Sequence, residues 1–362
     1  MTELSPENES IYRALARKLD EMPNGFPATE DGAELQLLAA MFTPDQAQLA
    51  AAMAPAPESG AVIAARAGVD PKPAYRALKE MVRHGLIFAH RGEGALNFSL
   101  MPFVVGFYEA QLPRMDAEMA ARFEAYFQAS RGMDIPGPSV HRVIPVGEAV
   151  GGDVEIHPYE QAAALIEGAK SWAVRDCICR TQQQLVGRGC DAPLESCLIF
   201  APVEGVFSEG GVDRPITKEE ALQILRETEE AGLVHTVANH RDGHNYICNC
   251  CTCCCGILRR VAEFSVPTAI ARSAFLAVVD DALCIGCGAC EERCSFAAIA
   301  VDAGLAVVEP LRCVGCGQCT LVCPVDALSL VRRPESEILA PPVDDAAWQA
   351  ERIAQRRQPP SP

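Results

Sequence analysis

The chain has 362 residues, 49% of them hydrophobic, which is enough material for roughly two or three domains with their own cores. Its formal charge of −17 argues against a nucleic-acid partner and suits docking on the basic patches of other proteins. No apolar run reaches ~18 residues and the first ten residues are polar and acidic, so we expect neither a membrane span nor a signal peptide. In the cytoplasm expected for such a chain, 18 cysteines indicate metal binding rather than disulfides.

Residues 1–58 are predicted to be a helical N-terminal segment. Ile11, Leu15 and Leu19 recur at helical spacing, and a second set of apolar residues continues the pattern to residue 53. The Pro55-Ala-Pro57 sequence then ends it.

Residues 59–104 have the element order of a winged helix. The pattern predicts a helix over 61–67, a second helix over 71–84 and a hairpin of strands 86–90 and 95–100. This order resembles helix-turn-helix domains, and the resemblance implies DNA binding through residues 71–84. The alternative is a winged helix used for packing or protein docking. This alternative is favoured, because the segment has only a small excess of basic residues and the whole chain is acidic.

Residues 105–138 are predicted to form a helix and a linker. Apolar residues spaced for one face predict an amphipathic helix over 106–131. The sequence of residues 133–138, which contains two prolines and a glycine, is typical of a linker.

Residues 139–275 alternate between strand and helix patterns, which predicts a central α/β domain. The expected strands are 140–146, 172–179, 198–202 and 233–237. The expected helices are 159–170, 217–231 and 254–264, the second opened by a capping box from Thr217 to Glu220.

This central domain contains ten cysteines in two groups, Cys177 to Cys197 and Cys248 to Cys255. In an extended segment Cys177 and Cys179 would point the same way, and glycines around the second group favour a loop that wraps a metal centre. Adjacent residues diverge, so only a subset of the second group can reach one site. The candidates for a further metal site are Cys177, Cys179, Cys197, Cys248, Cys250, Cys251, Cys253, Cys254 and Cys255.

The occupant of that further site is open between three interpretations. A third iron–sulfur cluster is favoured, zinc is the rival metal, and buried free thiols are the third alternative.

Residues 284–323 contain the strongest pattern of the chain. Two runs of C-x2-C-x2-C-x3-C begin at Cys284 and Cys313, 29 residues apart. This spacing lets a tight loop bring thiolates to one small iron–sulfur core. The glycines between the cysteines allow the positive φ angles of such a loop, and Ile285 and Val314 can shield the core from water.

The two runs resemble the bacterial-type two-cluster ferredoxin domain, over about residues 276–332. In that family the fourth cysteine of each run binds the other cluster. The resemblance implies two [4Fe–4S] clusters. Their ligand sets would be Cys284, Cys287, Cys290 and Cys323 for the first, and Cys313, Cys316, Cys319 and Cys294 for the second. Strands are expected at 275–280 and 305–308.

Residues 334–362 contain six prolines and one short helical pattern near 345–356, which predicts a flexible or partner-docking tail. The whole chain is predicted to be α+β, with an N-terminal winged-helix-like part, a Cys-rich centre and a ferredoxin-like C-terminal module.

The predicted function is electron transfer in the cytoplasm, as a carrier for or subunit of a larger oxidoreductase complex with redox partner proteins. The alternatives are a redox-sensing DNA-binding regulator and a reductase with catalysis at the central metal site.

Overall fold

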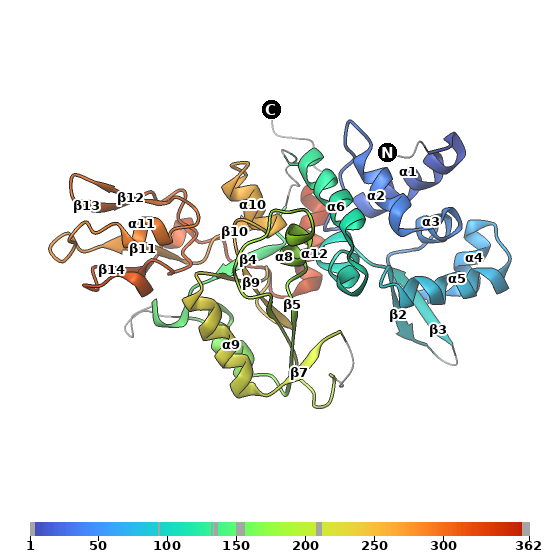
Figure 1. The fold of residues 1–362 in the computed structure, drawn as a ribbon. Helices are drawn as coiled ribbons and strands as arrows, with labels where there is room; N and C mark the ends of the chain where they lie inside the picture. Colours follow the sequence, from blue (N-terminus) through green and yellow to red (C-terminus); the bar gives the residue numbers. More distant parts are fainter. Residues whose placement is uncertain are drawn as a thin grey trace. The chain divides into compact units, whose positions relative to one another are not determined.

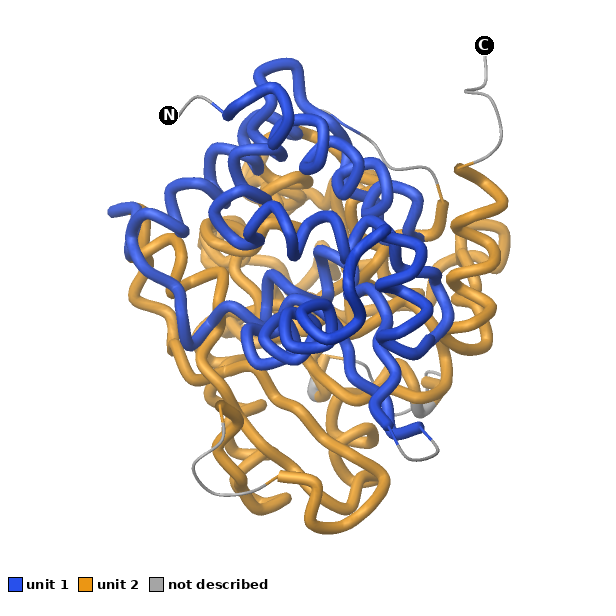
Figure 2. The backbone as a smooth tube through the Cα atoms, turned by 90° about the vertical axis from the view of Figure 1, so that its right-hand side faces the viewer, with its two compact units in different colours: residues 1–135, 185–187 blue, residues 136–184, 188–362 orange. Residues whose placement is uncertain are grey.

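The computed structural model describes residues 4–92, 95–131, 133, 137–149, 156–207 and 212–356. The chain divides into two compact units (Figure 2). Unit 1 contains residues 1–135 and 185–187, and unit 2 contains residues 136–184 and 188–362. Both helices and sheets are present, so the fold is α+β, as the sequence predicts.

Unit 1 is mainly helical with one small sheet. Its helices are α1 (Pro6–Asp20), α2 (Ala33–Met41), α3 (Pro44–Ala51), α4 (Gly60–Ala67), α5 (Pro71–Arg83) and α6 (Ala117–Ala129). Its strands β1 (Glu58–Ser59), β3 (Leu96–Leu100) and β2 (Ile87–Arg91) lie in that order in an antiparallel sheet. The Asp70 carboxylate accepts a hydrogen bond from the Lys72 backbone N–H at 3.1 Å and thereby caps α5.

The continuous helix predicted over 106–131 is wrong. A short 3₁₀ helix spans Glu109–Arg114, and α6 begins only at Ala117. Pro113 lies in the 3₁₀ segment, and the carboxylate of Asp116 accepts a hydrogen bond from the Met119 backbone N–H at 2.8 Å. Because a proline interrupts helical hydrogen bonding and a capped aspartate starts a new helix, the apolar pattern is divided into two pieces.

Unit 2 is built on a sheet of seven strands in the order β10-β4-β8-β9-β6-β5-β7 (Figure 1). Only the β10–β4 pair is parallel among the paired strands of this sheet. The strands are β4 (His141–Ile144), β5 (Ser171–Asp176), β6 (Glu195–Ala201), β7 (Arg214–Ile216), β8 (Val234–Ala238), β9 (Tyr246–Cys250) and β10 (Ile270–Ala271).

The helices of this part are α7 (Ala162–Glu167), α8 (Ile178–Leu185), α9 (Lys218–Glu230) and α10 (Gly256–Ala262). Helices α7 and α9 share one apolar core with the sheet, in which Ile166 and Ile224 meet Val174. The Thr217 hydroxyl accepts the Glu220 backbone N–H at 3.1 Å, which fixes the start of α9 where the capping box predicts it.

The sequence from residue 275 onward adds a compact four-stranded segment (Figure 1). Strand β11 (Phe275–Val279) pairs antiparallel with β14 (Leu328–Arg332), and β12 (Ile299–Asp302) forms a hairpin with β13 (Leu305–Val308). The short helix α11 (Ala289–Arg293) lies between β11 and β12 in sequence.

The C-terminal segment is packed against the central part of unit 2 as far as residue 356, rather than being flexible. Helix α12 (Asp345–Arg356) buries Trp348, whose indole N–H donates to the Ser139 carbonyl at 3.0 Å. The backbone N–H groups of Arg241 and Asp242 donate to the Pro342 and Val343 carbonyls, both at 2.9 Å. Within the part of the chain that the structure describes, no helix combines the length and apolarity that crossing a membrane requires.

Candidate metal centres

The two cysteine runs adopt the same backbone conformation. Equivalent positions 29 residues apart have positive φ: Gly286 (63°) and Gly315 (71°), Gly288 (82°) and Gly317 (79°), Ala297 (47°) and Asp326 (51°). A Cβ atom at Gly286 would lie 2.2 Å from the Gly304 carbonyl oxygen, and one at Gly315 would lie 2.2 Å from the Phe275 carbonyl oxygen. Only glycine fits either place, because both the φ angle and the backbone contact exclude a side chain.

The first set of thiols lines one recess of about 330 Å³, counted with its opening to solvent. The cysteines in its wall are Cys284, Cys287, Cys290 and Cys323. Backbone N–H groups face two of these sulfur atoms: Ala306 donates to Cys284 Sγ at 3.4 Å, and Ala327 donates to Cys323 Sγ at 3.2 Å. Such donors stabilise thiolates that carry the negative charge of a cluster, so the residues present fit an iron–sulfur core.

The second set contains Cys294 together with three cysteines of the other run. Burial, together with the neighbouring charges of Cys313 and Cys294, raises the pKa of Cys316 to about 12. The pKa of Cys319 is likewise raised, first by burial and then by the charges of Cys316, Cys313 and Cys294. The Ala298 backbone N–H donates to Cys294 Sγ at 3.2 Å, which repeats the contact of Ala327 with Cys323. The structure therefore places the fourth cysteine of each run beside the first three of the other.

The two sets differ in their exposure to solvent. Cys287 is exposed and Ile285 is 62% exposed, whereas Val314 is 4% exposed. Ile285 nevertheless lines the recess of the first set, and the shielding expected of Ile285 and Val314 stays a prediction. The second set is covered by the central part of unit 2: the Val146 backbone N–H donates to the Cys316 carbonyl at 2.9 Å.

The ten central cysteines gather where β5, β6 and β9 lie side by side. Cys197 is on β6, and Cys248 and Cys250 are on β9, which is its neighbour in the sheet. Cys177 directly follows β5, and Cys255 is the N-cap of α10. Antiparallel pairing of these strands thus brings cysteines about 70 residues apart in sequence to one place.

Six of the ten thiols form one connected group, which we call the six-thiol group. Its hydrogen-bonded neighbours are Cys177 with Cys179, Cys179 with Cys255, Cys255 with Cys250, Cys250 with Cys248, and Cys248 with Cys197. The hydrogen bonds from Cys248 and Cys255 lower the pKa of Cys250 to about 6. A group of this kind can supply four thiolates to a metal centre and keep the others beside it.

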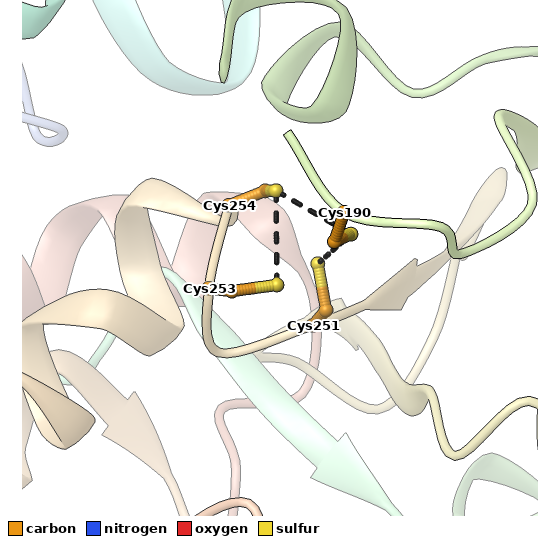
Figure 3. Close-up of side chains that lie close together, drawn as sticks. All are labelled: Cys190, Cys251, Cys253 and Cys254. Carbon is orange, nitrogen blue, oxygen red and sulfur yellow. Dashed lines mark hydrogen bonds between the residues drawn. The ribbon is translucent and has the colours of Figure 1, made fainter. Parts of the chain in front are cut away.

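The remaining four thiols point toward one another from two segments (Figure 3). Cys254 Sγ lies 3.7 Å from both Cys190 Sγ and Cys253 Sγ, and Cys190 Sγ lies 3.9 Å from Cys251 Sγ. We call these residues the four-thiol site. Cys190 is not among the nine candidates chosen from the sequence. It lies alone between Cys179 and Cys197, and its partners in the site are some 60 residues away.

Three local expectations about the cysteines are wrong. Strand β5 ends at Asp176 and α8 begins at Ile178, so Cys177 and Cys179 are not in an extended segment. Likewise Cys248 and Cys250 lie on strand β9 rather than in a loop. The divergence of adjacent side chains also fails at the turn after β9, where Cys253 and Cys254 reach the same site.

Arg180 lies between the two groups of thiols and is 0% exposed. Its guanidinium donates to the Asn249 carbonyl at 3.1 Å, to Cys251 Sγ at 3.8 Å and to the Ser196 hydroxyl. Burial alone would lower its pKa, but electrostatic interaction with Cys177 and Cys251 raises it overall. A buried cation here offsets the negative charge that several thiolates bring into the interior.

The thiol of Cys251 is acidic. Its pKa is lowered to about 4, first by a hydrogen bond from Cys254 and further by Cys253 and Arg180. Since the thiolate is the form that binds metals, the site presents one ligand already deprotonated at neutral pH.

Residues 277–330 match the family model of the 4Fe-4S dicluster domain. The matched segment contains all eight cysteines of the two runs. No curated protein and no solved structure matches the chain. The match and the gathered cysteines support the binding of iron–sulfur clusters and a role in electron transfer.

Proposed function

We propose that the chain is an electron-transfer protein whose residues 277–330 hold two [4Fe–4S] clusters. The first takes Cys284, Cys287, Cys290 and Cys323, and the second takes Cys313, Cys316, Cys319 and Cys294. The observation that carries the proposal is the position of the fourth cysteine of each run, which we call the exchange. Cys323 lines the recess of the first set, and Cys294 lies near the cysteines of the second run. The exchange makes each run contribute to both centres, which favours two neighbouring clusters over separate ions.

The clusters would supply one-electron chemistry, and the chain's own residues would set its conditions. Backbone N–H groups of Ala298, Ala306 and Ala327 donate to cluster-binding sulfurs. Hydrogen bonds to sulfur and exposure to solvent are the main influences of a protein on a cluster's potential. The exposed first set and the covered second set therefore favour two different potentials.

A third cluster in the six-thiol group would extend the relay. Cys250 and Cys255 share one buried apolar cluster with Cys290, Cys313 and Cys319. This continuous core supports electron passage from the six-thiol group to the second set and then to the first. The exposed Cys287 and Ile285 at the first set would then meet the redox partner, so the chain would act as a carrier for or subunit of an oxidoreductase complex.

The test is iron and acid-labile sulfide per chain of anaerobically purified protein, with electron paramagnetic resonance (EPR) of the reduced form. Two clusters give about eight iron atoms, and three give about twelve. Cys323→Ser is expected to alter the EPR signal of the first cluster, and Cys294→Ser that of the second. Fewer than four iron atoms per chain would refute the proposal, as would a Cys323→Ser protein whose spectrum equals that of the wild type.

One observation favours a second function for unit 1. Four basic residues lie exposed along α5: Lys72, Arg76, Lys79 and Arg83. This helix and the β2–β3 hairpin have the order of a winged helix, so unit 1 is a candidate for duplex DNA binding that responds to cluster oxidation. Fluorescence anisotropy with labelled duplex would measure it. Binding should weaken steeply with salt and fall in the Arg76→Glu, Lys79→Glu double variant. Equal anisotropy with and without protein at low salt would exclude this function.

A further inference from the structure

We infer that the four-thiol site, formed by Cys190, Cys251, Cys253 and Cys254, binds a single Zn²⁺ ion and is separate from any iron–sulfur cluster. The inference rests on the distances between the sulfur atoms. Three of the pairs are 3.7, 3.7 and 3.9 Å apart, and all four atoms lie within 4.8 Å of one another. It does not depend on the electron-transfer function proposed above.

These distances match a tetrahedron around one ion. With a Zn–S bond of about 2.3 Å, the edge of a regular tetrahedron of sulfur atoms is about 3.8 Å. In a four-iron cluster each thiolate binds a different iron on the outside of the core, so the thiolates stand farther apart.

The chain itself provides a comparison for this argument. Among the described residues, the four-thiol site is the group whose ligand atoms all lie within 4.8 Å. The eight ferredoxin-type cysteines are all described, and no three of their sulfur atoms approach one another so closely. The same holds for the six-thiol group. The four-thiol site is therefore distinct in its spacing from the positions that fit clusters.

The backbone around the site is already shaped for a small ion. Cys251, Cys253 and Cys254 lie on one turn, closed by a hydrogen bond from the Cys255 backbone N–H to the Cys251 carbonyl at 3.1 Å. The fourth ligand comes from the loop after α8, where a Cβ atom at Gly189 would lie 2.6 Å from Gln184 Cγ. The glycine lets this loop approach closely enough for Cys190 to complete the tetrahedron.

The ligands select the ion. Four thiolates in a tetrahedron suit Zn²⁺ or a single iron, and Zn²⁺ binds such ligands more tightly than Fe²⁺ does. Four protein ligands leave no open position, which is typical of a structural rather than a catalytic zinc. The Arg180 guanidinium, 3.8 Å from Cys251 Sγ, offsets part of the negative charge that four thiolates would leave on the complex.

The test is the metal content of the full-length, anaerobically purified protein and of three variants. We expect about one zinc per chain in the wild type. Cys190→Ser and Cys253→Ser should lose most of it while keeping the wild-type iron content. Cys197→Ser is the matched control, because it removes a thiol of the six-thiol group and should keep the zinc.

Two spectroscopic measurements on the wild type keep the test decisive where a variant fails to fold. The X-ray absorption fine structure at the zinc edge should show four sulfur neighbours at about 2.3 Å. Growth with cobalt should give the visible absorption of tetrahedral thiolate-bound Co²⁺. A zinc-free wild type would overturn the inference, as would zinc bound by nitrogen or oxygen. Loss of iron and sulfide together from Cys190→Ser would assign the site to a cluster, and loss of one iron without sulfide would assign it to a single iron.

Discussion

Gly286 and Gly315 hold the loops around the two ferredoxin-type sites at places where no side chain fits. We predict that Gly286→Ala lowers the iron content by about four atoms per chain, because the new methyl group would overlap the Gly304 carbonyl oxygen, 2.2 Å from its Cβ. The positive φ of 63° adds a backbone strain of about 1–3 kcal/mol. Iron and sulfide analysis measures the effect.

Gly147→Ala is the matched control for that substitution. A Cβ atom at Gly147 would meet nothing within 4 Å, so the variant should keep the wild-type iron content. An unchanged iron content in Gly286→Ala would show that the loop can move away and that the contact does not limit cluster binding.

At the residue scale the sequence predicts ligands well where their spacing is local. The two C-x2-C-x2-C-x3-C runs and their glycines can be found from the sequence because each loop is set by neighbouring residues. The partnership of Cys190 with Cys251 cannot be found in this way. It depends on a strand pairing and a turn that no local pattern specifies, and Cys190 has no close cysteine neighbour in sequence.

At the element scale, strand β4 contains a histidine that is buried as the neutral form. Burial lowers the pKa of His141 to about 4, and its ring nitrogens lie 2.9 Å from the Tyr246 hydroxyl and 3.3 Å from the Thr236 hydroxyl. An unfolded histidine takes up a proton near pH 6.5, whereas this one does so only near pH 4. The stability of unit 2 is therefore fully present above pH 6.5 and falls as the pH decreases toward 4.

Through His141, the free energy of unfolding of the wild type should fall by about 2 kcal/mol between pH 7 and pH 5. We predict that this part of the fall is absent in His141→Gln. The measurement is the urea midpoint at both pH values, followed by the fluorescence of Trp172 and Trp348, both of which lie in unit 2. His84→Gln changes a half-buried histidine of unit 1 and should keep the wild-type pH dependence. If the two variants show the same pH dependence, the acid sensitivity of unit 2 has another origin.

The elements that the sequence predicts correctly are those with a strong local pattern. Helix α9 starts at its capping box, and α12 has the bounds expected of residues 345–356. Among the missed elements are β9, whose cysteines and asparagine resemble a loop, and β7, which has three residues. Strand β7 pairs with β5 and β9 pairs with β6, both distant in sequence, and such pairing overrides local propensity.

At the scale of the whole molecule, the formal charge of −17 favours cationic redox partners. We predict that oxidation of the reduced protein by a small cationic acceptor slows roughly ten-fold as the salt concentration rises from 0.01 to 0.2 M. With an anionic acceptor the rate should rise instead, because salt screens a repulsion. Stopped-flow absorbance of the cluster colour measures both rates. Equal salt dependence for the two acceptors would show that the charge does not guide encounter.

The order of ligands along residues 248–255 alternates between the two central thiol groups. Cys250 belongs to the six-thiol group, the next three ligands belong to the four-thiol site, and Cys255 returns to the six-thiol group. The turn that would close around an ion is thus the same turn that spaces Cys250 from Cys255. A hydrogen bond from the Cys255 backbone N–H to the Cys251 carbonyl already closes this turn. The two centres are therefore expected to fill independently, and a cell starved of one metal would accumulate protein that lacks that centre alone.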